Sequence, residues 1–393
     1  MRYLMEDALE YIIDYRGKTP KKSDKGIETL SARSVRDGYI DYSQCYYISR
    51  DEYKKFMVRG FPHVGDVLLT TEAPLGITAR LDRDDVAIAQ RLLTLRGKEG
   101  ILDTGYLYYY LKSPLGQAKL KEKETGTTVT GIKQASFRKI EIDLPDLVTQ
   151  KRSVTILESI DKKKRINKQI NENLEQQLAT LFAHTFAKDI AVASTETCPK
   201  LGDLITVIDN RGKTPPLTTE IHDYPIIDVG ALKGTGRIVD FNNCTKYVEQ
   251  STYETWFRSG HPKPWDILIS TVGSLAEMKI YLGSKGCMAQ NVVALRATSI
   301  SPLYLYQYLR FIRADLVAYN IGSVQPSIKV THIVKHPIFV PERFKLVNFE
   351  EAAKAVTNQL YANYNENESL KELRDTLLPK LMSGELDVSD LDL

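Results

Sequence analysis

Hydrophobic residues in two parts of the chain fall into short aliphatic stretches that are bounded by glycine, proline and other turn residues. Residues 66–71 and 266–271 are the clearest examples, and residues 87–89 and 91–95 follow the same pattern. Short apolar runs of this kind are typical of buried strands. The pattern predicts globular parts that contain sheets, within a mixed α+β fold.

The pattern changes after Pro145. From about residue 150 the chain contains neither proline nor glycine until past Phe186, which predicts a helix of about 35 residues, longer than most globular helices. Its expected apolar stripe has heptad-like spacing, with Lys163 and Asn167 filling a gap in it. The stripe consists of Ile156, Ile160, Ile170, Leu174, Leu178 and Leu181.

A second long helix is expected from about Phe349 to Pro379, because a helix interior does not tolerate proline. Each helix would extend roughly 50 Å at about 1.5 Å per residue. Such a stripe usually marks an ordinary core helix. Its recurrence after each globular part favours a spacer, with the two helices packed antiparallel and residues 187–197 as a linker.

The chain is an internal repeat. Residues 13–20 return as residues 208–215, and five anchors recur at a constant separation. Two copies of one domain are therefore expected, in which the scaffold is kept and the surface differs. The expected segments are 1–147, a helical region 148–190, 197–345, and a helical region 346–385. The anchors are Pro62, Asp66, Thr71, Gln90 and Arg96, matched by Pro262, Asp266, Thr271, Gln290 and Arg296.

Composition narrows the class of protein. The 393 residues are 42% hydrophobic and 26% charged, and no apolar run approaches the roughly 20 residues that span a bilayer. The N-terminus lacks the order of a secretory signal, so we expect a cytoplasmic protein. Cys45 and Cys244 occupy equivalent places and predict reduced core thiols. A net charge of +3 permits a polyanionic partner without predicting one.

Motifs for common chemistries do not occur. The sequence has no P-loop, no H-E-x-x-H, no G-x-S-x-G, no metal-spaced cysteine and histidine set, and no Asn-Pro-Pro-Tyr or Asp-Pro-Pro-Tyr tetrapeptide. Its six histidines are not matched between the copies. The sequence therefore predicts a binding protein without catalytic residues, metal or cofactor of its own.

The polar residues shared by both copies suit a nucleic-acid surface. In the Gly-Lys-Thr-Pro turns, cations and backbone amides can hold phosphate. Thr71 and Thr271 end predicted strands, beside a Gln amide that can pair with an adenine edge or satisfy buried backbone groups. The cations of the turns are Arg16, Lys18, Arg211 and Lys213, and the amides are Gln90 and Gln290.

A third shared patch covers residues 126–133 and 322–329, where small and hydroxylated residues precede Lys133 and Lys329. Between the shared positions the copies differ: Arg91 is replaced by Asn291, and Glu-Ala-Pro-Leu-Gly at 72–76 by Val-Gly-Ser-Leu-Ala at 272–276. Shared residues are expected to hold phosphate and divergent residues to read bases. The tyrosines at 106–110 and 304–308 are expected to pack in helices.

With these motifs the chain resembles the specificity subunits of type I restriction-modification systems over essentially its whole length. The resemblance rests on Arg-Gly-Lys-Thr-Pro near each domain start, Glu-Ala-Pro-Leu-Gly at 72–76, and Ile-Lys at the end of each third patch. The segments 181–186 and 373–386 at the helix ends complete it. The second copy departs from the family pattern at 272–276.

The resemblance implies two target-recognition domains, 1–147 and 197–345, that each read half of a split, asymmetric double-stranded DNA site. The helices would pack as an antiparallel coiled coil, set the unread spacer and dock two modification subunits. Those subunits carry S-adenosylmethionine and methylate adenine N6, and restriction (translocase and nuclease) subunits join them. The alternatives are a protein-binding scaffold and a self-sufficient DNA methyltransferase or nuclease.

Overall fold

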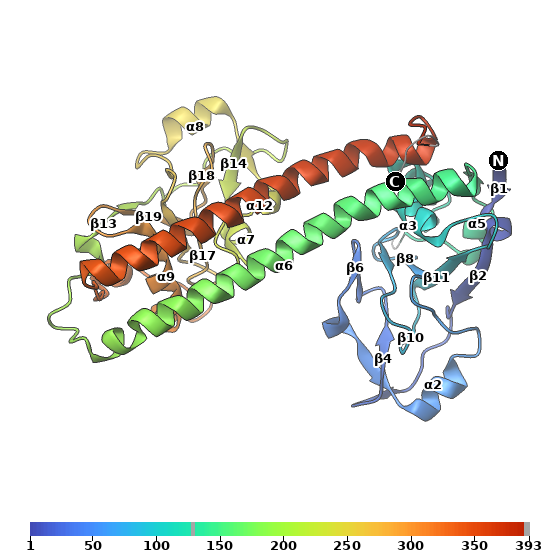
Figure 1. Cartoon of the computed structure of the whole chain (residues 1–393), viewed down its shortest axis with the longest axis horizontal. Coiled ribbons are helices and arrows are strands. Elements are labelled where there is room, and N and C mark those ends of the chain that lie inside the picture. The colour runs from blue at the N-terminus through green and yellow to red at the C-terminus, as the bar shows by residue number, and fades with distance from the viewer. Residues whose placement is uncertain (127–129, 389–393) are drawn as a thin grey trace. The chain divides into compact units, whose positions relative to one another are not determined.

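A computed structural model of the chain describes residues 1–126 and 130–388, which form two compact units (Figure 1). The first unit comprises residues 1–164 and the chain from Ser369 onward, and the second comprises residues 165–368. Each unit contains one copy of the repeat with part of both long helices. The long helices are α6 (Leu147–Val192) and α12 (Arg343–Ser383).

The other elements of the first unit are short. The strands are β1 (Arg2–Leu4), β2 (Leu9–Asp14), β3 (Lys22–Ser23), β4 (Ile27–Leu30), β5 (Val35–Arg36), β6 (Tyr39–Ile40), β7 (Tyr46–Ile48), β8 (Val67–Thr70), β9 (Thr78–Arg80), β10 (Ala87–Ile88), β11 (Leu92–Gly97) and β12 (Glu141–Asp143). The helices are α1 (Met5–Ala8), α2 (Arg50–Phe56), α3 (Thr104–Lys112), α4 (Pro114–Glu122), α5 (Gln134–Arg138) and the 3-10 turn η1 (Tyr42–Gln44).

The second unit repeats this order with fewer strands. They are β13 (Ile205–Ile208), β14 (Tyr224–Ile227), β15 (Tyr247–Val248), β16 (Ile267–Ser270), β17 (Met278–Ile280), β18 (Cys287–Met288) and β19 (Val292–Ala297). The helices are α7 (Val229–Leu232), α8 (Gln250–Trp256), α9 (Pro302–Phe311), α10 (Arg313–Ala318) and α11 (Val330–Lys335), with 3-10 turns η2 (Leu201–Asp203) and η3 (Phe241–Asn243).

A four-stranded antiparallel sheet forms the centre of each unit. Its strand order is β2-β11-β8-β9 in the first unit and β13-β19-β16-β17 in the second. Successive residues of β8 face opposite sides, and both sides are buried: Val67 and Leu69 pack into one apolar cluster and Leu68 into another. This two-sided burial explains why the strands are continuous aliphatic runs, as the sequence predicted.

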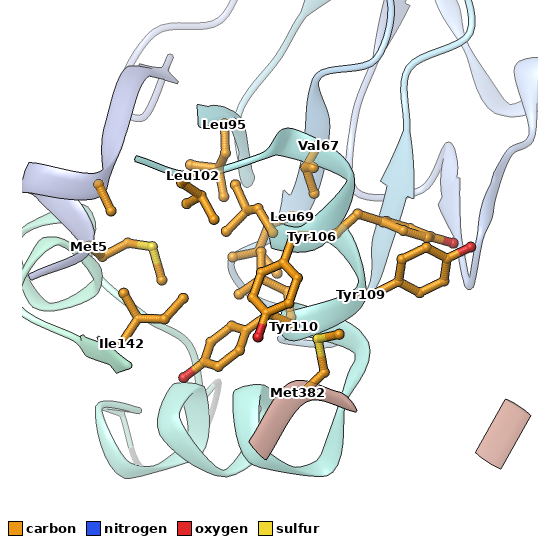
Figure 2. Close-up of a cluster of buried hydrophobic side chains, with 14 of the residues drawn as sticks. Met5, Val67, Leu69, Leu95, Leu102, Tyr106, Tyr109, Tyr110, Ile142 and Met382 are labelled. Atoms are coloured by element: carbon orange, nitrogen blue, oxygen red, sulfur yellow. The ribbon is translucent and has the colours of Figure 1, made fainter. Parts of the chain in front are cut away.

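One face of the first sheet packs on α3, whose tyrosines face the core. Tyr106, Tyr109 and Tyr110 are each at most 2% exposed, and Figure 2 shows them beside Leu69 and Met382. Burial raises the pKa of Tyr110 to about 12. The prediction that these tyrosines pack in a helix rather than stack on bases is confirmed.

The long helices α6 and α12 contact each other within each unit. Val154 and Leu157 of α6 share an apolar cluster with Leu378 and Leu381 of α12. In the second unit Phe182 of α6 contacts Phe349 of α12 at 5.5 Å between ring centroids, and Asn167 donates to Glu366 at 2.7 Å. In the second unit the later residue of α6 meets the earlier residue of α12, so the two helices run antiparallel there.

The expected end of the second helix at Pro379 is wrong, because α12 continues to Ser383. A proline inside a helix costs about 3 kcal/mol, through a lost hydrogen bond and a steric clash. After Pro379 the helix buries Leu381 and Met382, which are 1% and 2% exposed. Full burial of such side chains contributes about 1.5–3 kcal/mol each, enough to offset the proline.

The predicted stripe on α6 is wrong at Ile170 and Leu181, which are 40% and 39% exposed. The buried line passes instead through Asn167, Leu178 and Phe182. Asn167 is buried because its amide bonds Glu366 and Asn367 across the helix pair, at 2.7 and 3.0 Å. A prediction based on the spacing of apolar residues cannot find a polar residue that is buried by pairing between two helices.

Candidate nucleic-acid interface

One end of each central sheet holds three loops together through the backbone of a threonine. The amide of Thr71 donates to the carbonyl of Arg91 at 3.0 Å, and its carbonyl accepts from the amide of Ile132 at 2.9 Å. Thr271 makes the same pair of bonds, with Asn291 and Ile328, both at 2.8 Å. The structure therefore brings together the loops that the repeat comparison singled out separately.

The two threonines are buried, which places them as anchors of these loops. Thr71 is 6% exposed and Thr271 is 0% exposed. Their neighbours Arg91, Lys133 and Lys329 are exposed. The neighbours are therefore more accessible to a ligand than the threonines, and the DNA contact expected of Thr71 and Thr271 stays a prediction.

The two glutamines connect the same end of each sheet to the Arg-Gly-Lys-Thr-Pro turns. The side-chain amide of Gln90 donates to the hydroxyl of Thr19, and that of Gln290 donates to the hydroxyl of Thr214 at 2.8 Å. Both glutamines are at least partly exposed. The partners are hydroxyl groups rather than the buried backbone groups of the alternative interpretation. Each amide therefore holds its Arg-Gly-Lys-Thr-Pro turn beside the loop that contains the glutamine.

In the first unit a carboxylate lies between two arginines. Glu72 accepts from Arg16 at 3.3 Å and pairs with the Nε of Arg91 at 2.6 Å. Its side chain is 19% exposed, whereas those of Arg16 and Arg91 are 46% and 57% exposed. Lys18 is also exposed in the turn. Arg16, Lys18 and Arg91 form one exposed basic surface, and Glu72 helps to fix the side chains of the two arginines.

The second unit uses a different arrangement at the same place. Val272 stands where Glu72 stands in the first copy, and Arg211 pairs with Asp209 at 2.6 Å within its own turn. Burial alone would raise the pKa of Asp209, but bonds from the side chain and amide of Arg211 hold it below its usual value. Lys213 is exposed, and Asn291 is partly buried.

Lys133 and Lys329 are the residues that precede α5 and α11, and both are exposed beside the threonine anchor. Residues 127–129 of the first patch, expected to approach a phosphate backbone, lie outside the described residues. The predicted site residues therefore gather, copy by copy, at one end of each central sheet.

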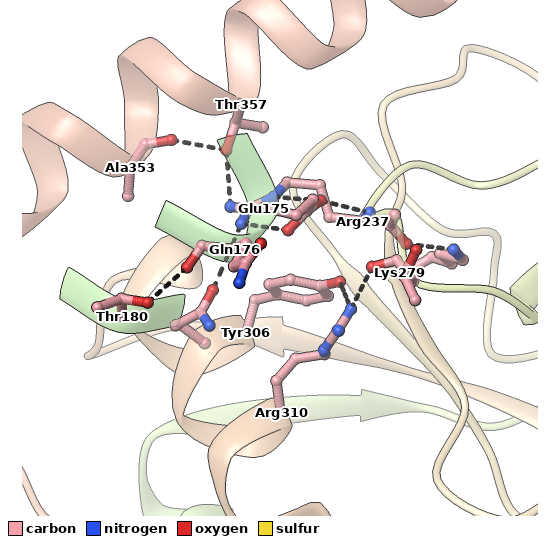
Figure 3. A network of polar contacts seen from close by, with 12 residues as sticks. Glu175, Gln176, Thr180, Arg237, Lys279, Tyr306, Arg310, Ala353 and Thr357 are labelled. Atoms are coloured by element: carbon pink, nitrogen blue, oxygen red, sulfur yellow. Dashed lines mark hydrogen bonds and ion pairs between the residues drawn. The ribbon is translucent and has the colours of Figure 1, made fainter. Parts of the chain in front are cut away.

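The repeat comparison missed a buried polar network in the second unit, shown in Figure 3. Arg237, whose side chain is 0% exposed, bonds Glu175 of α6 through Nε at 3.0 Å and Nη2 at 2.8 Å, and Thr357 of α12 through Nη1 at 3.0 Å. Its Nη2 also donates to Gln307 of α9 at 3.4 Å. One guanidinium thus connects the globular part of this unit to both long helices.

Among residues 1–126 and 130–388, no group of three or more histidine, cysteine or carboxylate side chains could hold a metal ion. In the same part of the chain, no helix is long and apolar enough to cross a membrane.

Comparisons with known proteins show what the chain resembles. Residues 15–176 match the family model for the type I restriction modification DNA specificity domain. The type I restriction enzyme MjaIX specificity subunit of Methanocaldococcus jannaschii is 25% identical over 370 residues, which cover 88% of this chain and 84% of that protein. The HindI specificity subunit of Haemophilus influenzae is 21% identical, over 78% of this chain and 82% of that protein.

A solved structure has a similar fold. A crystal structure of the type I restriction-modification S subunit from M. genitalium superposes with a TM-score of 0.56 at 16% identity, covering 97% of this chain and 95% of that one. The chain is similar over most of its length to type I restriction enzyme specificity subunits, and residues 15–176 match the DNA specificity domain model.

Proposed function

We propose that each unit reads one half of a bipartite, asymmetric double-stranded DNA site. The observation that carries this proposal is that each unit presents an exposed basic surface at the equivalent end of its own central sheet. The threonine anchor is common to both surfaces, whereas the residues beside it differ between Arg91 and Asn291 and between Glu72 and Val272. A common frame with different side chains suits two half-sites of different sequence.

In this proposal the shared cations neutralise phosphates and the divergent side chains read base edges in the major groove. The domains 1–147 and 197–345 would act as the two target-recognition domains, and the helical regions 148–190 and 346–385 as the spacer between them. Half-site centres about one helical turn apart, near 34 Å, would suit helices of this length.

The chemistry would belong to partner subunits. Two modification subunits carrying S-adenosylmethionine would methylate adenine N6 within the site, and restriction subunits would complete the nuclease. Such an assembly acts where the DNA is, in the cytoplasm. The self-sufficient methyltransferase alternative requires the isolated chain to bind S-adenosylmethionine, which a direct binding titration measures.

The proposal is tested by replacing Lys133 or Lys329 with alanine and measuring binding of the reconstituted complex to DNA across a range of salt concentrations. Each substitution should weaken binding to all sequences and lower the slope of log K against log salt by about one unit per lost phosphate contact. Lys54 of α2 is exposed and provides a control of equal charge. An unchanged slope would remove these lysines from the interface.

The protein-binding scaffold is separated from the proposal by mapping adenine methylation in cells that carry the chain and its modification partner. A split motif, with one half changed when residues 1–147 are exchanged, supports two half-site readers. Sequence-independent DNA binding by the complex would support a scaffold instead.

A further inference from the structure

Beside the threonine anchor of the first unit lies a surface pocket of about 540 Å³. The described residues that line it include three cations and no carboxylate. The cations are Lys22, Arg33 and Arg91, with Tyr46 and Gln90 as polar or aromatic neighbours. A wall that presents several hydrogen-bond donors suits a partner that presents acceptors.

Two of the three cations, Arg91 and Lys22, contact neighbouring side chains. Glu72 pairs with the Nε of Arg91 at 2.6 Å. Arg91 also has a backbone φ of 68°, an uncommon conformation for a bulky residue that is found preferentially at functional sites. The ammonium of Lys22 lies 4.8 Å from the centre of the Tyr46 ring. Arg91 and Lys22 are therefore positioned in the absence of a ligand.

Strand register identifies the matching positions of the second unit. Leu30 pairs with Ile88 in the first unit, and Ile227 pairs with Met288 in the second, so residues 31 and 33 correspond to residues 228 and 230. Arg33 is thereby replaced by Gly230, and Ser31 by the acid Asp228.

The neighbouring strand gives the same result. Ser23 pairs with Tyr47, and Thr218 bridges to Tyr247, so Lys22 corresponds to Leu217. With Arg91 replaced by Asn291, all three cations of the pocket are absent from the second copy. The threonine anchor is therefore common to both units, whereas the positions that line the pocket change from hydrogen-bond donors to a mixture that includes the acceptor Asp228.

We infer that this pocket is the base-reading site of the first unit and that it selects guanine, through the O6 and N7 acceptors of its major-groove edge. Arginine and lysine pair with these two atoms, whereas an adenine presents a donor beside N7 and a cytosine presents a donor. Arg91 and Arg33 make the contacts, and Glu72 is a positioning residue for Arg91. The inference rests on the proposed function and assigns a base class to one half-site.

The test uses the reconstituted complex of this chain with its modification subunits. Methylation mapping first gives the two half-sites of the wild-type complex. Each guanine of those half-sites is then replaced by 7-deazaguanine, which lacks the N7 acceptor, and binding is measured by fluorescence anisotropy. At a guanine in one half-site, the replacement should weaken binding about 5- to 150-fold, corresponding to about 1–3 kcal/mol.

The variants Arg91→Asn and Arg33→Ala should lose this sensitivity in that half-site and keep it in the other. Asparagine tolerates the left-handed backbone of residue 91, so the first variant keeps the local fold. Lys54→Ala, which removes an exposed cation outside the pocket, should retain the sensitivity.

The inference is overturned if the half-site altered by exchange of residues 1–147 contains no G·C pair. It is also overturned if both pocket variants keep the 7-deazaguanine sensitivity of the wild type. In either case the complex still binds a specific site, so the proposed function stands. A wild-type complex without any sequence preference would overturn the proposed function itself.

Discussion

Replacing Glu175 with alanine is expected to lower the free energy of unfolding of the second unit by about 3–5 kcal/mol. The substitution leaves the guanidinium of Arg237, whose side chain is 0% exposed, without its carboxylate partner. Two bonds join the guanidinium to Glu175, at 3.0 and 2.8 Å. Bonds to charged groups contribute about 1.5–3 kcal/mol each, so the loss of both gives a similar figure of about 3–6 kcal/mol.

The assay is urea denaturation of the full chain followed by tryptophan fluorescence. Both tryptophans, Trp256 and Trp265, lie in the second unit, so their emission reports its unfolding. Glu172 is exposed on the same helix and gives a matched control. Glu172→Ala should change the free energy of unfolding by no more than about 0.5 kcal/mol.

A double variant separates the loss of the ion pair from the loss of the side chain. Replacing Glu175 and Arg237 together with methionine removes both charges, and removal of a whole buried pair is often neutral or stabilising. The double variant should therefore be more stable than Glu175→Ala. A cost below 1 kcal/mol for Glu175→Ala, or an equal cost for Glu172→Ala, would refute the assignment of a buried, uncompensated charge.

Three further outcomes are expected. Burial, and after it the charge of Arg310, lowers the pKa of Lys279 from 10.5 to about 8. Below about pH 8 the charged lysine therefore lowers the free energy of unfolding of the folded state. This destabilisation disappears as pH rises from about 8 to 10.5. The free energy of unfolding of the wild type, measured in urea relative to that of Lys279→Met, should therefore increase across that pH range. A difference that does not change with pH would contradict this expectation. Asn167→Ala should cost about 1–3 kcal/mol because it removes two hydrogen bonds made by a buried amide, each of which contributes about 0.5–1.5 kcal/mol. A change under about 0.5 kcal/mol by the same fluorescence assay would show that water replaces the amide. Glu72→Gln should tighten low-salt binding to non-specific DNA while reducing discrimination at one half-site, since two arginines lose their compensating charge; equal binding in both respects would remove Glu72 from the interface.

The repeat made the central sheet and the loop positions predictable. Residues 66–71 and 266–271 contain β8 and β16, because aliphatic runs buried on both faces leave a clear signal in one sequence. Two copies at constant separation also pointed to Gln90 and Gln290 before their hydroxyl partners were known. Similar local sequences form similar local contacts.

The contacts of Arg237 could not be predicted in this way. Its partners lie 62, 70 and 120 positions away in the chain, on three different helices. Nothing in the sequence around residue 237 distinguishes it from a surface arginine. The exposed Ile170 failed for a related reason, since the face that a helix buries depends on the other helix against which it packs.

Arg237 also bears on how such a chain can exchange parts by recombination. A segment limited to residues 197–345 would carry Arg237 into a new context and leave Glu175 behind on α6. The transferred arginine would then depend on whatever residue the recipient helix offers at that level. The segment that can be exchanged intact for this half of the protein therefore includes a piece of the preceding helix. A crossover at the apparent domain boundary would give a less stable protein unless the recipient helix already has an acidic residue at the position of Glu175.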